Sequence, residues 1–133
     1  MKEIPLFKVH MPSDADKAIG SVLNSGFVAC GPKTELFEKK FGEFIGNQHM
    51  VATNNCTSAI MLSIKMADLK PGDDVICTPL TCHAVNQAVY QFGVNIIWAD
   101  IDLRNGNILP ESIVKHITSN TKAIVYSHWV GRL

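Results

Sequence analysis

The sequence predicts an α/β fold built on a mainly parallel β-sheet, and two observations carry this prediction. Short apolar runs, such as "VICT" at 75–78 and "NIIWA" at 95–99, alternate with segments whose apolar residues recur at helical spacing. Clusters of turn-forming residues separate them, as in "DLKPGDD" at 68–74. Strands that alternate with helices in this way form parallel βαβ units, whose crossovers are right-handed.

The first part of the chain predicts two helices. Ser13 can cap the first helix, which ends near residues 24–26. In the second helix, Gly31 breaks the chain, Pro32 suits a first helical position, and Gly46 terminates the helix. The apolar stripe of the second helix is Leu36, Phe37, Phe41 and Phe44.

The rest of the chain predicts strands and helices in alternation. The expected strands are 49–54, 75–78, 95–99 and 122–127, and the expected helices are 57–67, 83–92 and a short one that begins near Pro110. The segments 95–99 and 123–127 are rich in apolar residues, which suits burial on both faces, as in a parallel sheet. Without later elements, we expect some of this surface and at least one strand edge to stay open.

Composition restricts the class of protein. The chain has 133 residues, which is the length of one domain. Its twelve basic and twelve acidic residues give no net charge, so the charge suggests neither a nucleic acid nor an anionic membrane as partner. No apolar run approaches the ~20 residues that span a bilayer. The start, "MKEIPLFKVH", has no export signal, and the four cysteines are not spaced as a disulfide framework. We therefore expect a cytoplasmic protein with reduced thiols.

The stretch "VATNNCTSAIML", residues 51–62, changes from an apolar strand end to a helix through small polar residues. In open α/β sheets, ligands collect beyond the carboxyl ends of the strands, where the following helices begin. The N–H groups at a helix N-terminus can hold a phosphate, and Thr57 and Ser58 would add hydroxyl donors. Ordinary capping of the helix by Asn55 or Thr57 explains the same residues.

Five stretches occur in order along the chain: "SGFVACGPKTELFEKKFGEFIG", "NNCTSAIML", "KPGDDVICTPLTCHAVNQAV", "GVNIIWADIDLRNGNILPESI" and "TSNTKAIVYSHWVG". Together they resemble the N-terminal part of the DegT/DnrJ/EryC1/StrS family of sugar aminotransferases, which are pyridoxal-phosphate enzymes of fold type I. The resemblance runs from Ile4 to Arg132. It implies a three-layer αβα arrangement in a single incomplete domain, with an N-terminal helical segment at 1–35 and the start of the large, cofactor-binding domain at 36–133.

The resemblance also implies a function. Members of the family transfer an amino group, usually from glutamate, to a keto sugar carried on a nucleotide. They bind pyridoxal 5'-phosphate and work as homodimers with active sites at the subunit interface.

The same resemblance implies cofactor-binding residues. "NNCTSA" falls where the family usually has Ser-Gly-Thr and a small residue that hold the cofactor phosphate, which indicates Cys56, Thr57 and Ser58. Cys56 stands where glycine is common, and its side chain is costly if the site needs a positive φ or a close backbone approach. Cys82 falls at the aromatic residue that stacks on the pyridine ring. Either Cys82 packs against the ring or His83 supplies the flat surface. Alternatively, Cys82 belongs to the core and His83 to the first turn of a helix.

Other chemistry has weaker support. Cys77, Cys82 and His83 lack the matching second pair of a zinc site, so we expect no metal. His128 and Trp129 follow the last strand, where they either line a pocket or pack against the domain. The lysine that carries the cofactor lies further downstream in the family, and Lys65, Lys70 and Lys122 do not match it, so we expect the 133-residue chain alone to be inactive.

Three alternative functions follow from the same sequence. The chain can be a non-catalytic phosphate- or nucleotide-binding module, a degenerate partner subunit, or part of a related sugar dehydratase.

Overall fold

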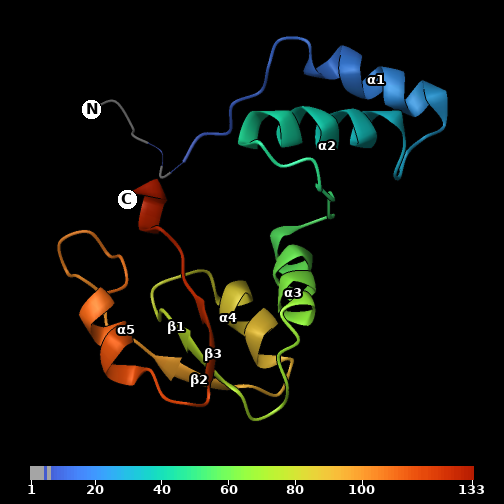
Figure 1. Ribbon diagram of the computed structural model, residues 1–133. Helices are drawn as coiled ribbons and strands as arrows, with labels where there is room; N and C mark the ends of the chain where they lie inside the picture. The colour runs from blue at the N-terminus through green and yellow to red at the C-terminus, as the bar shows by residue number, and fades with distance from the viewer. Residues whose placement is uncertain (1–4, 6) are drawn as a thin grey trace, which may run out of the picture. The chain divides into compact units, whose positions relative to one another are not determined.

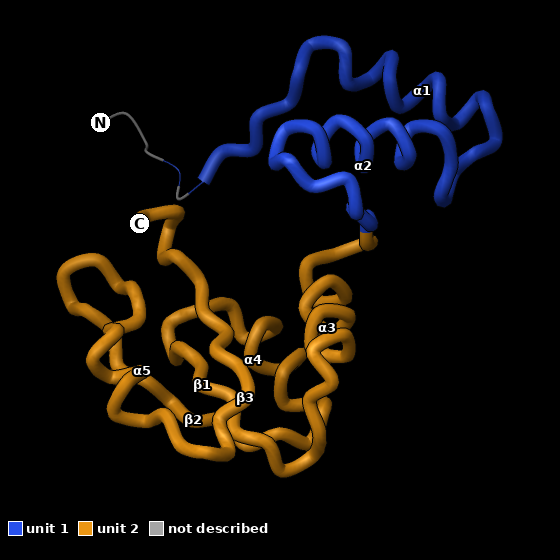
Figure 2. Tube along the Cα trace, viewed as in Figure 1, with its two compact units in different colours: residues 1–52 blue, residues 53–133 orange. Residues whose placement is uncertain are grey.

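The protein, described here by a computed structural model, has two compact units. They are Met1–Ala52 and Thr53–Leu133, shown in blue and orange in Figure 2, and each is treated by itself. The structure describes residue 5 and residues 7–133, so "MKEIPLFKVH" lies partly outside the described residues. The predicted division of the domain at residue 35 remains a prediction.

The N-terminal unit contains the two predicted helices, α1 (Ala15–Ser25) and α2 (Pro32–Ile45) (Figure 1). Both end at a glycine in the left-handed region, Gly26 with φ 78° and Gly46 with φ 73°, as the sequence predicts.

The prediction that Ser13 caps α1 is wrong. The N-cap position is Asp14, and no side chain forms a cap hydrogen bond there. The Ala15 N–H, the first backbone amide of the helix, donates instead to the Pro12 carbonyl at 3.1 Å. This hydrogen bond closes a backbone turn that includes Ser13, so the amide needs no side-chain cap.

The predicted strand 49–54 is also wrong. None of its residues belongs to a strand, and the chain passes directly into helix α3 (Cys56–Met66). Val51 is 71% exposed, and the Ala52 N–H donates to the Glu38 carboxylate of α2 at 2.7 Å. A strand needs a neighbouring strand to receive its backbone hydrogen bonds, and no described strand lies beside this segment. The described sheet therefore has three strands instead of the four predicted.

The C-terminal unit contains a parallel sheet in the order β2-β1-β3. Its elements after α3 are β1 (Asp74–Cys77), α4 (His83–Tyr90), β2 (Asn95–Trp98), α5 (Pro110–His116), β3 (Thr121–Val125) and the 3-10 turn η1 (Trp129–Gly131). The alternation and the parallel pairing agree with the sequence prediction. Among residues 7–133, no helix combines the length and the apolar character needed to cross a bilayer.

Two apolar clusters lie on opposite faces of this sheet. On one face, Val75 and Cys77 of β1 pack with Ile64 of α3 and Val89 of α4. On the other face, Ile76 packs with Ala99 and Ile108, and Ile113 of α5 joins this second cluster. Side chains alternate between the faces of a strand, so successive residues of β1 serve the two clusters. Helices therefore cover both faces, which confirms the three-layer αβα fold.

Only the central strand is buried on both faces. Residues 75–77 of β1 are fully buried, whereas Trp98 of β2 is 50% exposed and Ile124 of β3 is 43% exposed. The sequence predicts that 95–99 and 123–127 suit burial on both faces but keep part of this surface open in the absence of further strands. The exposure of Trp98 and Ile124 agrees with this prediction, because the strand order places both strands at the edges of the described sheet. Apolar pattern alone does not determine the position of a strand in a sheet.

Candidate functional site

The carboxyl edge of the sheet gathers the segments predicted to bind ligands. Helix α4 begins after β1, and α3, which precedes β1 and packs against α4, begins at the same edge. A hydrogen bond of 2.9 Å between the hydroxyls of Thr81 and Ser127 joins the segments that follow β1 and β3. This edge is where ligands bind in open α/β sheets.

The N-terminus of α3 has an ordinary cap. The Asn55 side-chain oxygen accepts from the Ser58 N–H at 2.8 Å, and the Ser58 hydroxyl donates to the Asn54 side-chain oxygen at 2.9 Å. Capping by Asn55 is therefore part of the explanation for this junction, and it uses both donors of Ser58.

Two further backbone donors at this end remain open. The N–H groups of Cys56 and Thr57 and the Thr57 hydroxyl form no hydrogen bond with any described residue. Cys56 is exposed, and it is not among the described residues with positive φ, so its position does not require glycine for conformational reasons. Two amides, one hydroxyl and the partial positive charge of the helix end fit a phosphate group.

Cys82 and His83 lie on either side of the start of α4. Cys82 is the N-cap residue and is exposed, so the alternative that places it in the core is wrong. His83 is the first residue of the helix, as the second half of that alternative predicts. The buried thiol is Cys77, and burial raises its pKa to about 11.

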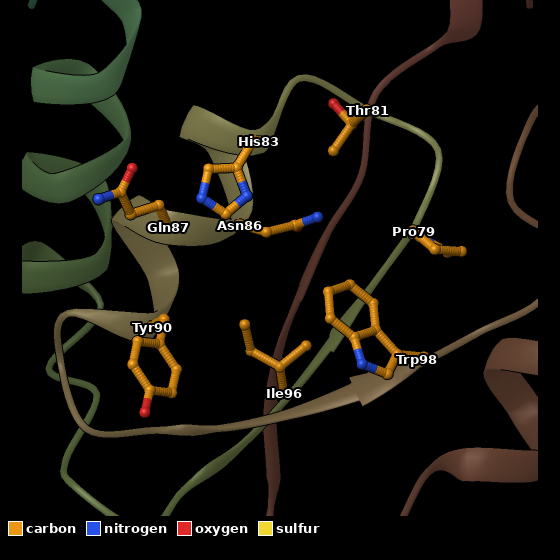
Figure 3. Close-up of a pocket in the computed structure, with 8 residues that line it drawn as sticks. All are labelled: Pro79, Thr81, His83, Asn86, Gln87, Tyr90, Ile96 and Trp98. Atoms are coloured by element: carbon orange, nitrogen blue, oxygen red, sulfur yellow. The ribbon is translucent and has the colours of Figure 1, made fainter.

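His83 also borders a groove between α4 and the edge strand β2 (Figure 3). The groove has a volume of about 650 Å³. Its lining residues are Pro79, Thr81, His83, Asn86, Gln87, Tyr90, Ile96 and Trp98. The sequence prediction includes only His83 of this set. A signal was present, because residues 83, 86, 87 and 90 recur at the helical spacing i, i+3, i+4 and i+7 and are not apolar aliphatic residues.

Asn86 anchors the helix side of the groove to the end of β1. Its side-chain amide donates to the Thr78 carbonyl at 3.2 Å, and Thr78 is only 1% exposed. The Asn86 side-chain oxygen is buried and has no partner among the described residues. The first turns of α4 are thereby held against the sheet.

Trp129 both packs and lines a second hollow. The backbone N–H of Trp129 donates to the Asn107 side-chain oxygen at 2.8 Å, and a Cβ at Gly106 would lie 2.8 Å from the Trp129 ring. It borders a hollow of about 340 Å³ together with Asp102 and Arg104. The hydrogen bonds from Arg104 lower the pKa of Asp102 to about 2. The His128 ring stacks edge-on against Tyr126, with 5.2 Å between ring centres.

Comparison with known proteins finds relatives that are aminotransferases or take part in polysaccharide biosynthesis. A sequence model of the DegT/DnrJ/EryC1/StrS aminotransferase family matches residues 10–133. The spore coat polysaccharide biosynthesis protein SpsC of Bacillus subtilis (strain 168) is 39% identical over 114 residues, which is 86% of this chain and 29% of that protein.

Solved structures agree with this result. The sugar aminotransferase CalS13 from Micromonospora echinospora is 34% identical with a TM-score of 0.89, over 98% of this chain and 36% of that one. The E. coli GDP-4-keto-6-deoxy-D-mannose-3-dehydratase with bound hydrated PLP is 28% identical with a TM-score of 0.84, over 93% of this chain and 33% of that one. The chain thus spans about a third of the length of these relatives.

Proposed function

The chain belongs to the DegT/DnrJ/EryC1/StrS aminotransferase family, and on that premise we propose that it forms the N-terminal part of a pyridoxal-phosphate-dependent sugar aminotransferase. The substrate is a nucleotide-linked keto sugar, the amino donor is glutamate, and the product serves the biosynthesis of a polysaccharide. SpsC supports the last point, because its name assigns it to spore coat polysaccharide biosynthesis.

The observation that supports this proposal best is the set of open donors at the start of α3. The N–H groups of Cys56 and Thr57 and the Thr57 hydroxyl would hold the cofactor phosphate, while Ser58 keeps the helix capped through Asn55. When bound, the cofactor supplies an electron sink for chemistry at the substrate carbon, and this chain's contribution is to fix its position. Cys82 and His83, at the start of the neighbouring helix α4, are proposed to border its ring.

The lysines of the C-terminal unit support inactivity of the chain by itself. Lys65 and Lys115 lie in the last turns of α3 and α5, Lys70 precedes β1, and Lys122 is the second residue of β3. Each of these positions leads into a strand, so all four lie toward the amino edge of the sheet, opposite to the cofactor site. We propose that the Schiff-base lysine comes from other residues of the full-length protein.

The proposed assembly and compartment follow from the same premise. We propose a homodimer in the cytoplasm, without nucleic-acid or membrane partners. All four cysteines are free, which is typical of proteins from a reducing compartment.

A sugar dehydratase of the same family is the second candidate. It is favoured by the E. coli GDP-4-keto-6-deoxy-D-mannose-3-dehydratase, which matches 93% of this chain at a TM-score of 0.84. The two functions would share the phosphate-binding residues, and they would differ in residues that this chain does not contain.

Binding of 4-deoxypyridoxine 5'-phosphate tests the phosphate site, because this analogue has no aldehyde to react with surface lysines. We expect saturable binding by equilibrium dialysis, competition by inorganic phosphate, and no binding of the phosphate-free 4-deoxypyridoxine. Thr57→Val should weaken binding about tenfold, since it removes a hydroxyl donor to a charged group. Ser63→Ala on the same helix is the matched control, because the Ser63 hydroxyl donates to the Ala59 carbonyl within α3. Equal affinity of both variants and the unaltered chain would remove Thr57 from the site.

A further inference from the structure

We propose that the groove between α4 and β2 binds an uncharged heteroaromatic ring, namely a nucleobase. This inference rests on the proposed function, in which the sugar is carried on a nucleotide, and it assigns the base of that nucleotide to residues of this chain.

The strand order makes the groove possible. β2 pairs only with β1, so one side of β2 has no described strand beside it. Ile96 and Trp98, two residues apart, point to the same face of this strand, and α4 lies over that face. The result is a hollow with a strand on one side and a helix on the other. Figure 3 shows the rings of His83, Tyr90 and Trp98 bordering it, with Ile96 between the two large aromatic side chains.

The lining selects for a flat and uncharged ligand. No carboxylate, ammonium or guanidinium group belongs to the eight residues that line the groove. The two aromatic side chains are open to a ligand, because Tyr90 is 70% exposed and Trp98 is 50% exposed. Stacking on such side chains is a general way to hold a base, since every base has a flat face.

The polar groups of the groove suit the edge of a base. Gln87 is exposed, and its side-chain amide forms no hydrogen bond with a described residue, so it offers both a donor and an acceptor. Amide side chains pair with bases through such combinations. A phosphate would find no lysine or arginine side chain here, and a pyranose would present several hydroxyl donors to a lining without carboxylate acceptors.

The size and position of the groove agree with this assignment. Its volume of about 650 Å³ accommodates a nucleoside and lies in the range of small-molecule sites, about 300–1,000 Å³. Thr81, His83 and Trp98 form the end nearest to the carboxyl edge of the sheet. A base in the groove can therefore extend its ribose and phosphates toward that edge, where the proposed cofactor site lies.

NMR titration with neutral nucleosides tests the proposal directly. The chain has two tryptophans, so it gives two indole N–H signals, and Trp129→Phe identifies the one that belongs to Trp98. We expect guanosine or uridine to shift the Trp98 signal saturably and to leave the Trp129 signal in place. Tyr90→Ala should weaken this binding about tenfold. Tyr126→Ala, the same change at the other of the two tyrosines, should leave the affinity within twofold. Both tyrosines are exposed, at 70% and 47%, so neither change empties the core.

Three outcomes would overturn the proposal. They are the absence of a saturable Trp98 shift with either nucleoside, equal loss of binding in the two tyrosine variants, and an equal shift with methyl α-D-mannopyranoside, which would indicate a sugar site. The nucleosides carry no phosphate and no keto sugar, and no cofactor is added. Nucleoside binding without binding of 4-deoxypyridoxine 5'-phosphate would therefore retain the base site and reject the proposed aminotransferase. Binding of 4-deoxypyridoxine 5'-phosphate without nucleoside binding would reject the base site and retain the proposed aminotransferase.

Discussion

Gly42→Ala should destabilise helix α2, although glycine-to-alanine changes inside helices usually stabilise them by about 1 kcal/mol. Gly42 is buried, and a Cβ at this position would lie 2.5 Å from the Asn47 carbonyl oxygen and 3.2 Å from the Met50 side chain. The oxygen belongs to the backbone of a turn in which the Asn47 N–H donates to the Gly42 carbonyl at 2.9 Å, so it cannot move away without breaking that turn.

The size of the effect follows from a matched pair. Gly20 lies inside α1 with nothing within 4 Å of its added Cβ, so Gly20→Ala reports the helix propensity alone. Overpacking costs about 1–3 kcal/mol, and this cost is the expected difference between the two variants, because the propensity gain is common to both. Gly42→Ala alone should therefore lower the local stability of α2 by up to about 2 kcal/mol.

Amide hydrogen exchange read by mass spectrometry can measure this, because it reports on peptides from α1 and α2 separately. We expect slower exchange in α1 of Gly20→Ala and faster exchange in α2 of Gly42→Ala, by about tenfold for each 1.4 kcal/mol. Slower exchange in α2 of Gly42→Ala would refute the reasoning, since the close approach of the 47–50 segment to α2 would then not exist in solution.

Three further predictions follow from the same structure. The free energy of unfolding should fall between pH 9 and 11, because the unfolded chain loses the Cys77 proton near its ordinary pKa of 9.0, whereas the folded chain holds this proton up to a pKa of about 11. The expected loss is about 1.4 kcal/mol per pH unit. Urea titrations at several pH values should show this dependence of stability on pH for the protein and not for Cys77→Ala. The chain should associate with itself, because Phe37, Phe41 and Phe44 are 56%, 40% and 85% exposed. Sedimentation at several low-micromolar concentrations should show dimers or larger species. A single monomeric species with a cooperative melt would favour a stand-alone phosphate- or nucleotide-binding module. The 133-residue chain should show no transamination of nucleotide-linked keto sugars, and turnover together with borohydride trapping of the cofactor on one of its own lysines would contradict the proposed role of residues outside it.

Sequence by itself determined the features that depend on local chemistry. Pro32 and Gly46 define the bounds of α2, because proline suits a first helical turn and glycine adopts the left-handed conformation that ends a helix. The alternation of strands and helices, the parallel pairing and the family were equally predictable. The junction at 54–58 was predictable as a helix start, although the sequence left capping and phosphate binding as alternatives.

Tertiary structure decided what depends on neighbours. The segment 49–54 has apolar residues at 50–52, but no described strand lies beside it, so its Ala52 amide donates to the Glu38 carboxylate and the predicted strand is not formed. Strand β2 has three apolar residues out of four, as the central strand β1 does, and β3 has three out of five, yet the edge positions of β2 and β3 leave Trp98 and Ile124 open.

The candidate sites divide in the same way. Helix spacing placed the polar side chains of α4 on one face, but only the position of β2 at the sheet edge turned that face into a groove with Trp98. At Cys56, the sequence shows only that glycine is absent; the backbone conformation shows that glycine is not needed there. A residue type constrains its own backbone, whereas burial, pairing and ligand access depend on chain segments far away in the sequence, whose arrangement no local pattern encodes.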